Sequence, residues 1–172
     1  MKLTTTFKRL RSCNACKPRY TLLRTALPAE EYRDDTPINL LTILETNGLD
    51  DALWALRATD QNCDKIARLM AADFAEMVLP IWEAKYPEDK RPALAIETAR
   101  DYANGLISAG QMGTIASDAW NATWDNVQFG HLAETEAARS ALAASTARSD
   151  RLVKQREIFV RYLQEEQTNE AE

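Results

Sequence analysis

Residues 51–105 read DALWALRATDQNCDKIARLMAADFAEMVLPIWEAKYPEDKRPALAIETARDYANG, and this stretch decides the fold class of the chain. From Ile66 to Ile81, apolar side chains recur at i, i+3 and i+4 over about four turns, which is typical of an amphipathic helix. Pro80 lies inside this pattern and predicts a kink, because proline cannot donate to the carbonyl one turn back. A second helical pattern begins at Arg91–Pro92 and stops at Gly105.

Further helical patterns flank this stretch on both sides. The sequence predicts a helix from about Cys16, and another with Thr36 as its N-cap and Pro37 in its first turn. The long helix that contains Ile66 is expected to open at Thr59 or Asp60. No convincing strand is found in the pattern. The chain is therefore expected to be all-α, a single-domain irregular helical bundle of about seven or eight helices.

Length and composition agree with this expectation. The chain has 172 residues, with 45% hydrophobic side chains, five glycines and six prolines, which suits one soluble helical domain. We expect residues 1–166 to form that domain and residues 167–172 to be a frayed charged tail. No apolar run reaches the roughly 20 residues of a membrane span, and the N-terminus lacks a secretory signal pattern. Three cysteines favour a reducing compartment, so the prediction is a cytoplasmic protein.

The charge is distributed unevenly along the sequence. Residues 1–27 contain seven Lys or Arg and no acid, whereas the rest of the chain carries 14 basic and 26 acidic side chains. One interpretation is a basic first helix lying on an acidic body; another is an acidic body that meets a basic protein partner. A third is a nucleic-acid-binding arm, whose contacts would be Lys8, Arg9, Arg11, Lys17 and Arg19.

The cysteines offer a weak metal hypothesis. Cys13 and Cys16 form a CxxC, and Cys63 with His131 would complete a four-ligand zinc site and a zinc-stabilised domain. The spacing to the last two ligands is arbitrary, however, and there is no second CxxC or HxxxH. The alternative is that Cys16 and Cys63 are small buried residues packed between helices. We expect no metal or cofactor.

Catalytic motifs are missing from the sequence. It contains no GxSxG, no HExxH and no glycine-rich phosphate loop. The single histidine, His131, leaves no choice of a histidine general base. No Glu-x-x-His pair suggests a di-iron bundle. The sequence therefore supplies no catalytic residues, and the prediction is a protein that is not an enzyme.

A set of charged residues flanks the apolar stripes. Glu97 and Arg100 stand at i, i+3 and can pair on one helix surface. Together with Arg57 and Asp73 they are interpreted as a structural polar set that fixes the register of the helices. The alternative is a polar cluster that binds a ligand.

Four tryptophans divide into two pairs. Trp54 and Trp120 fit core positions, whereas Trp82 and Trp124 fall on the margins of their stripes. A marginal tryptophan is either a half-buried lid or the anchor of a protein interface. Glu76 and Glu83 lie two turns apart on one face of the helical segment that also contains Trp82. The candidate binding residues are therefore Trp82, Trp124, Glu76 and Glu83.

The central segment resembles a known family. ALWALRA, then the helix with Asp73 and LPIWE, then YPEDKRPALAIETARDYANG, are similar to the putative immunity protein family of bacteria and bacteriophages. RPALAIETAR is the most specific part of this resemblance. RLRSCNACKPRYTLLRTALP is similar to a cysteine-containing helix that often precedes the family's core, and KQREIFVRYLQE resembles its C-terminal half.

The resemblance implies a small helical protein that binds and neutralises another protein, a function inferred in that family from gene neighbourhood. It supplies no catalytic residues. The expected function is a non-enzymatic inhibitor or immunity-type protein in the cytoplasm of a bacterial host; a phage-encoded member would occlude a surface of a host defence complex. A homodimer is a second possibility, because an alanine-rich helix and marginal tryptophans can pack on themselves.

Overall fold

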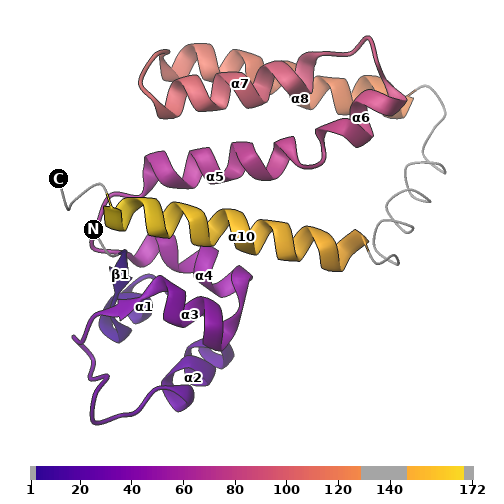
Figure 1. The fold of residues 1–172 in the computed structure, drawn as a ribbon. Helices are drawn as coiled ribbons and strands as arrows, with labels where there is room; N and C mark the ends of the chain where they lie inside the picture. The colour runs from indigo at the N-terminus through magenta and orange to yellow at the C-terminus, as the bar shows by residue number, and fades with distance from the viewer. Residues whose placement is uncertain (1–2, 129–146, 169–172) are drawn as a thin grey trace. The chain divides into compact units, whose positions relative to one another are not determined.

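The computed structural model describes residues 3–128 and 147–168 (Figure 1). These residues are almost entirely helical, which confirms the predicted all-α class. By their internal contacts they divide into two compact units, residues 1–63 with 156–172 (unit 1) and residues 64–155 (unit 2). The single domain expected over residues 1–166, and the frayed tail after it, stay predictions.

Unit 1 is built from short helices and one pair of very short strands. The elements in order are β1 (Thr4–Thr5), α1 (Phe7–Ser12), α2 (Lys17–Ala26), β2 (Ile38–Asn39), α3 (Leu40–Asn47), α4 (Leu49–Ala55) and the 3₁₀ turn η1 (Leu56–Ala58). The last described helix, α10 (Ala147–Thr168), belongs to unit 1 from residue 156 onward.

The helix start predicted at Thr36–Pro37 is wrong. Ile38–Asn39 instead forms β2, which pairs antiparallel with β1 and is therefore held extended. α3 consequently begins at Leu40. Asn39 is its N-cap, because the Oδ1 of Asn39 accepts a hydrogen bond from the backbone N–H of Leu41 at 2.9 Å.

The stop predicted at Asn47–Gly48 is confirmed. Gly48 ends α3 with φ of 89° and ψ of 179°, a conformation that only glycine adopts readily. The same residue takes the N-cap position of α4. Asp50 and Asp51 lie in the first turn of α4, where carboxylates interact favourably with the helix dipole.

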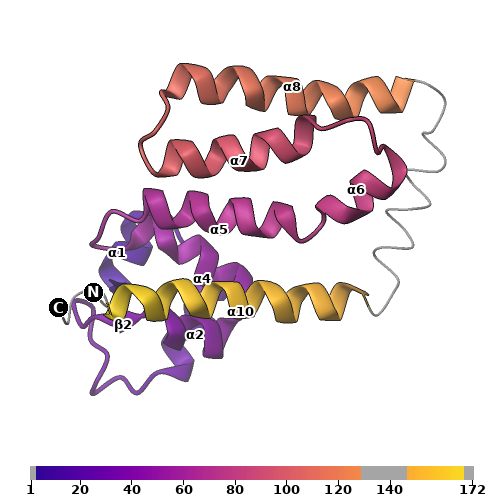
Figure 2. The same cartoon turned by 45° about the horizontal axis from the view of Figure 1, so that its top comes forward.

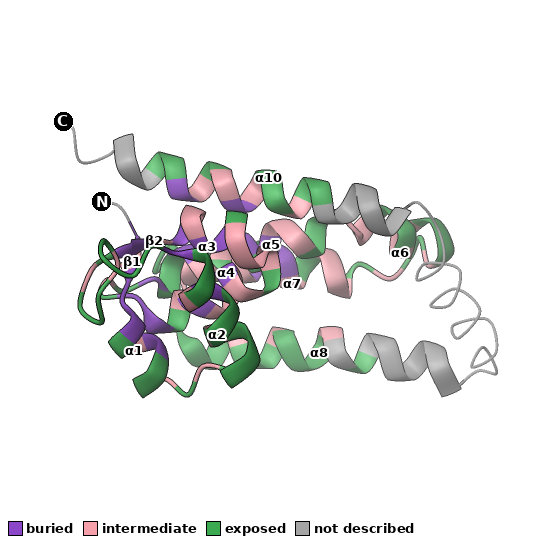
Figure 3. Cartoon of the chain, turned by 90° about the horizontal axis from the view of Figure 1, so that it is seen from below, coloured by how far each residue is buried: buried purple, intermediate pink, exposed green. Residues whose placement is uncertain are grey.

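The core of unit 1 is compact and apolar. Thr6 caps α1 by accepting a hydrogen bond from the N–H of Arg9 at 3.1 Å. Phe7, the first residue of α1, is buried. The ring of Phe7 meets that of Tyr20 edge-on, with 5.5 Å between centroids. Figure 3 shows this burial along the chain. The buried apolar side chains of elements β1 to η1 include Phe7, Leu10, Leu23, Ile38, Leu40, Ile43, Leu44, Ala52, Ala55 and Ala58.

The described part of unit 2 contains helices α5 (Asp64–Glu76), α6 (Leu79–Lys85), α7 (Arg91–Ala103) and α8 (Ala109–Gln128), together with the first residues of α10. α5 packs on α7, and α7 packs on α8, so the three long helices lie side by side (Figures 1 and 2). α7 begins with Pro92 in its first turn, as predicted, and Gly105 follows its end with φ of 74°. Within the described residues, no helix combines the length and apolarity needed to cross a membrane.

The long helix predicted to open at Thr59 or Asp60 and to kink at Pro80 is wrong in its start and its continuity, because α5 begins at Asp64 and ends at Glu76. The structure breaks it into α5 and α6, and Pro80 lies in the first turn of α6, where its missing N–H leaves no gap in the hydrogen bonds. The N–H of Val78 bonds to the carbonyl of Ala75 at 3.1 Å, which tightens the end of α5.

The break changes which apolar residues are buried. Ile66 and Met70 on α5 are buried, as the pattern predicts. The most apolar run of the segment, residues 77–82 (MVLPIW), contains no buried residue, and Ile81 is 53% exposed. The described part of unit 2 thus leaves apolar surface at α6 uncovered.

Candidate functional site

An apolar groove lies among the four helices of unit 2. It has a volume of about 410 Å³, and apolar residues form its whole lining. α5 contributes three alanines to the lining, and residues 78–82 at the start of α6 contribute three apolar side chains. α7 contributes four residues and α8 contributes one alanine. The lining residues are Ala71, Ala72, Ala75, Val78, Leu79, Trp82, Pro92, Ala95, Ile96, Ala99 and Ala119.

Helical spacing explains the alanine walls. Ala71 and Ala75 are four residues apart on α5, as Ala95 and Ala99 are on α7, so each pair lines one face. Alanine fills little of the space between helices, which leaves the groove open. These alanines carry no functional signal in the sequence, because an alanine in a helix looks like an ordinary helix former.

Trp82 is held firmly at the groove without being buried. Its ring packs against Tyr86, with 4.6 Å between the ring centroids. The indole N–H donates to the carbonyl of Asp89 at 3.3 Å. A ring fixed in this way loses little conformational freedom when a partner covers it. This geometry suits an interface anchor of the kind predicted for Trp82.

A guanidinium connects two of the helices that wall the groove. Arg100 on α7 donates to Asp73 on α5 at 2.7 Å, and to both carboxylate oxygens of Glu76 at 3.1 and 2.6 Å. These hydrogen bonds hold the pKa of the Glu76 carboxyl below its ordinary value and raise the pKa of Arg100. The cluster therefore links α5 to α7, and its role in fixing their register stays a prediction.

The structural polar set predicted from the sequence is brought together only in part. Asp73 and Arg100 meet, with Glu76 as their third member. Glu97 is exposed, and Arg100 turns to α5 instead of pairing with it along α7. Arg57 lies in unit 1, where its guanidinium stands 5.2 Å from the ring of Trp54.

The remaining predicted binding residues have separate places. Glu83 is paired with Lys90 at 3.3 Å on the surface. Trp124 belongs to α8, but its side chain lies outside the described part of the structure. The predicted tryptophan pair therefore cannot be assembled from described side chains, and of the two only the Trp82 side chain is described at the groove.

The basic residues near the N-terminus are largely engaged by acids of unit 1. Four of the five predicted nucleic-acid contacts form ion pairs, Lys8 with Asp35, Arg9 with Asp60, Arg11 with Asp34 and Arg19 with Asp51. Arg9 also donates to the backbone carbonyls of Ala58 and Thr59. The fifth residue, Lys17, is exposed. These ion pairs agree with the interpretation of a basic first helix lying on acidic residues, which stays a prediction.

The three cysteines are free thiols in different surroundings. The Sγ of Cys13 lies 3.8 Å from the carbonyl oxygen of Arg57, and the Sγ of Cys63 lies 3.1 Å from the hydroxyl of Thr59. Cys16 is exposed. No group of three His, Cys, Asp or Glu suited to a metal ion occurs among the described residues. His131, the fourth ligand of the zinc hypothesis, lies outside them.

Comparison with known proteins finds a family that matches the central segment of the chain. Residues 57–126 match the model of the family described as Imm-5 like putative immunity protein. This confirms the predicted resemblance for that segment and indicates an immunity-type role for the family. No curated protein and no solved structure gives a significant match to the chain.

The matched segment and the groove coincide. Every residue that lines the groove falls within residues 57–126, as do Arg100 and its two carboxylate partners. The resemblance predicted for the cysteine-containing helix and for the C-terminal helix lies outside the match and stays a prediction.

Proposed function

We propose that this chain is an immunity-type protein that binds another protein through the apolar groove of unit 2, with Trp82 as the anchor. The observation that carries the proposal is the uncovered apolar surface at α6. A run of six apolar residues with none buried, beside a groove lined wholly by apolar side chains, is what a recognition surface requires.

The partner's chemistry follows from the groove and from the charge. The alanine walls leave room for apolar side chains such as leucine or valine, presented by a helix or a loop. Residues 57–126 contain seven basic and eleven acidic side chains, and the chain outside its first 27 residues is more acidic still. A partner with basic residues flanking an apolar segment would therefore be attracted and oriented.

The proposed mechanism is occlusion of a functional surface of the partner. It requires no bond chemistry from this chain, only a contact of about 800 Å² on each side with a well-packed centre. Trp82 and the groove provide that centre, and the acidic surroundings provide the polar rim. If the chain is encoded by a phage, the occluded protein belongs to a host defence complex.

The alternatives gain no support from the geometry. Nucleic-acid binding would need free cations, and four of the five named side chains are already paired with acids. A homodimer through the groove is distinguishable by its mass, because it would form in the purified chain alone.

The experiment uses a charge placed in the groove. Ala75 is exposed and lines the groove, so Ala75→Glu should fold normally but bury an unpaired carboxylate when a partner docks. Ala84 on α6 is also exposed and does not line the groove, which makes Ala84→Glu the matched control. Tagged wild type and both variants serve as baits in lysate of the native host.

We expect wild type and Ala84→Glu to retain the same protein in stoichiometric amount, and Ala75→Glu to lose it. Retention by all three baits would show that a partner exists but docks elsewhere. Recovery of chaperones alone would contradict the protein-binding function itself. Circular dichroism of the three baits checks that the fold is unchanged.

A further inference from the structure

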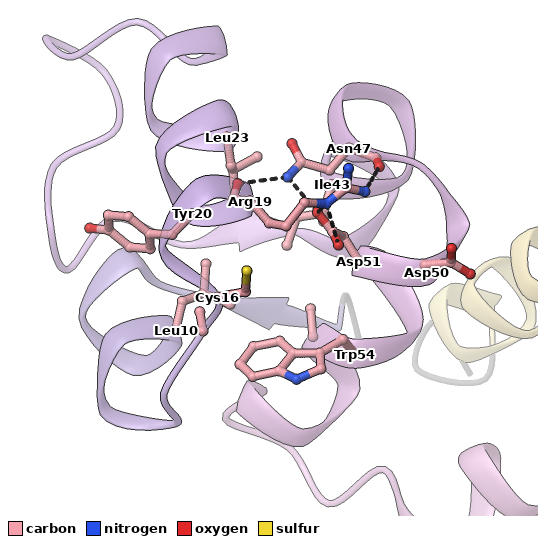
Figure 4. A pocket seen from close by; sticks show the side chains of 12 residues that line it. Leu10, Cys16, Arg19, Tyr20, Leu23, Ile43, Asn47, Asp50, Asp51 and Trp54 are labelled. Atoms are coloured by element: carbon pink, nitrogen blue, oxygen red, sulfur yellow. Dashed lines mark hydrogen bonds and ion pairs between the residues drawn. The ribbon is translucent and has the colours of Figure 1, made fainter.

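Unit 1 contains a separate pocket, with a volume of about 240 Å³ (Figure 4). Its floor consists of side chains that are themselves buried, chiefly Leu10, Leu23 and Ile43. Its mouth is formed by α2, where Cys16 and Arg19 are exposed. Neither the family match nor the proposed function involves this pocket, because all of it lies before residue 57.

Two aromatic residues are among those that line the pocket. Tyr20 and Trp54 contribute rings from α2 and α4, and the sulfur of Cys16 points towards the side of Arg19 (Figure 4). Aromatic rings favour aromatic partners in offset or edge-to-face contact. This lining therefore suits a flat apolar group.

The guanidinium of Arg19 is fixed at the mouth. Its Nε donates to both carboxylate oxygens of Asp51 at 2.9 and 2.8 Å, and its Nη2 donates to the carbonyl of Asn47 at 2.8 Å. The side-chain amide of Asn47 donates in turn to the carboxylate of Asp51 at 2.7 Å. A guanidinium held in one plane can stack on an aromatic ring.

The charges at the pocket leave it close to neutral. Arg19 and Asp51 neutralise each other as an ion pair, and the carboxylate of Asp50 points away from Cys16 and Trp54 (Figure 4). A charged ligand would lose hydration on the apolar floor and find no free counter-charge there. An uncharged ligand enters without that cost.

The size limits the ligand further. Sites for drug-sized molecules usually occupy about 300–1,000 Å³, so a pocket of about 240 Å³ suits a single compact ring system. We propose that this pocket binds one uncharged aromatic group of about the size of indole. That group is carried either by a free small molecule or by a tryptophan side chain of a protein.

The test uses two neighbouring thiols of the intact chain. Cys16 lines the pocket and Cys13 does not, although neither is buried. The chain is treated with iodoacetamide in the presence of indole or of a blocked Gly-Trp-Gly peptide, and the alkylation rate of each cysteine is followed by peptide mass spectrometry. At a probe concentration about three times its Kd, mass action should slow alkylation of Cys16 about fourfold and leave Cys13 unchanged.

A filling variant gives the control. Ala15→Leu, in the turn just before α2, should occupy the pocket from its rim and abolish the protection, whereas Ala26→Leu, at the exposed end of α2, should keep it. Tighter protection by the peptide than by indole assigns the pocket to a protein side chain, and equal or better protection by indole assigns it to a small molecule. No protection by either probe, or equal slowing of Cys13, would overturn the proposal. Neither result bears on the groove of unit 2.

Discussion

Gly48 joins α3 to α4 in a backbone conformation that other residues adopt at a cost. A Cβ at this position would meet no atom within 4 Å, so the cost of a substitution is conformational and not steric. Gly48→Ala is expected to lower the free energy of unfolding by about 1–3 kcal/mol. Urea denaturation measures the change.

The control for Gly48→Ala is Gly113→Ala, in the interior of α8. A Cβ there also has open space, but the backbone is helical. The substitution should therefore stabilise the protein by about 1 kcal/mol, because alanine favours a helix more than glycine does. If Gly48→Ala and Gly113→Ala lowered the free energy of unfolding by the same amount, the conformational explanation would be refuted.

Arg100 offers a second test at the residue scale. Arg100→Met removes the hydrogen bonds to Asp73 and Glu76 and should cost about 2 kcal/mol, as expected for hydrogen bonds to charged groups that are partly buried. The control is Lys90→Met, which breaks the exposed pair with Glu83 and should cost under about 1 kcal/mol. Chemical denaturation at pH 7 measures both.

The pH dependence of this difference has a fixed sign. The folded pKa of Glu76 is depressed below its ordinary value of 4.5. The ionised Glu76 therefore contributes to the free energy of unfolding above pH 4.5, and this contribution is lost as the pH falls through the folded pKa. The difference in the free energy of unfolding between wild type and Arg100→Met should be smaller at pH 3 than at pH 7. A larger difference at pH 3 would contradict the role of Glu76.

Single residues also show what the sequence could predict. The helix stop at Gly48 was predicted correctly because a glycine after a helical pattern has a local signature, whereas the binding role of Trp82 stays a prediction. The contact between Arg100 and Glu76 was missed, because the two residues are 24 positions apart and belong to different helices. Helical spacing shows only partners on the same helix, such as Glu97.

At the scale of elements, Pro80 is the test of the break between α5 and α6. Pro80→Ala restores a donor, so the segment should extend α5 towards α6 and turn Trp82 away from the groove. We expect amide hydrogen exchange at residues 77–81 to slow severalfold. Unchanged exchange would show that residues 77–78, and not Pro80, determine where α5 ends.

Periodicity predicted the existence of most helices but not their boundaries. The apolar spacing from Ile66 to Ile81 continues through the break, because a pattern of side chains does not register where backbone hydrogen bonds end. The two-residue strands were invisible for a similar reason. β2 is too short to show alternation, and its pairing with β1 is a contact over more than 30 residues.

At the scale of the whole molecule, the charge pattern predicts weak interaction with nucleic acid. The net charge is −5, and most of the basic N-terminal side chains already hold carboxylates. Fluorescence anisotropy with duplex DNA should show no saturable binding at physiological salt. Saturable binding whose affinity falls steeply with salt, by about 0.9 log units per phosphate contact for each tenfold increase, would support the arm instead.

We propose that a partner protein covers the groove beside Trp82. Site-specific photo-crosslinking in the native host tests it most directly, with benzoylphenylalanine placed at Ala75 in the groove or at Ala84 outside it. We expect one heterologous adduct of defined mass from position 75 and none from position 84. An adduct from position 84 alone, the same adduct from both, or none from either would contradict it.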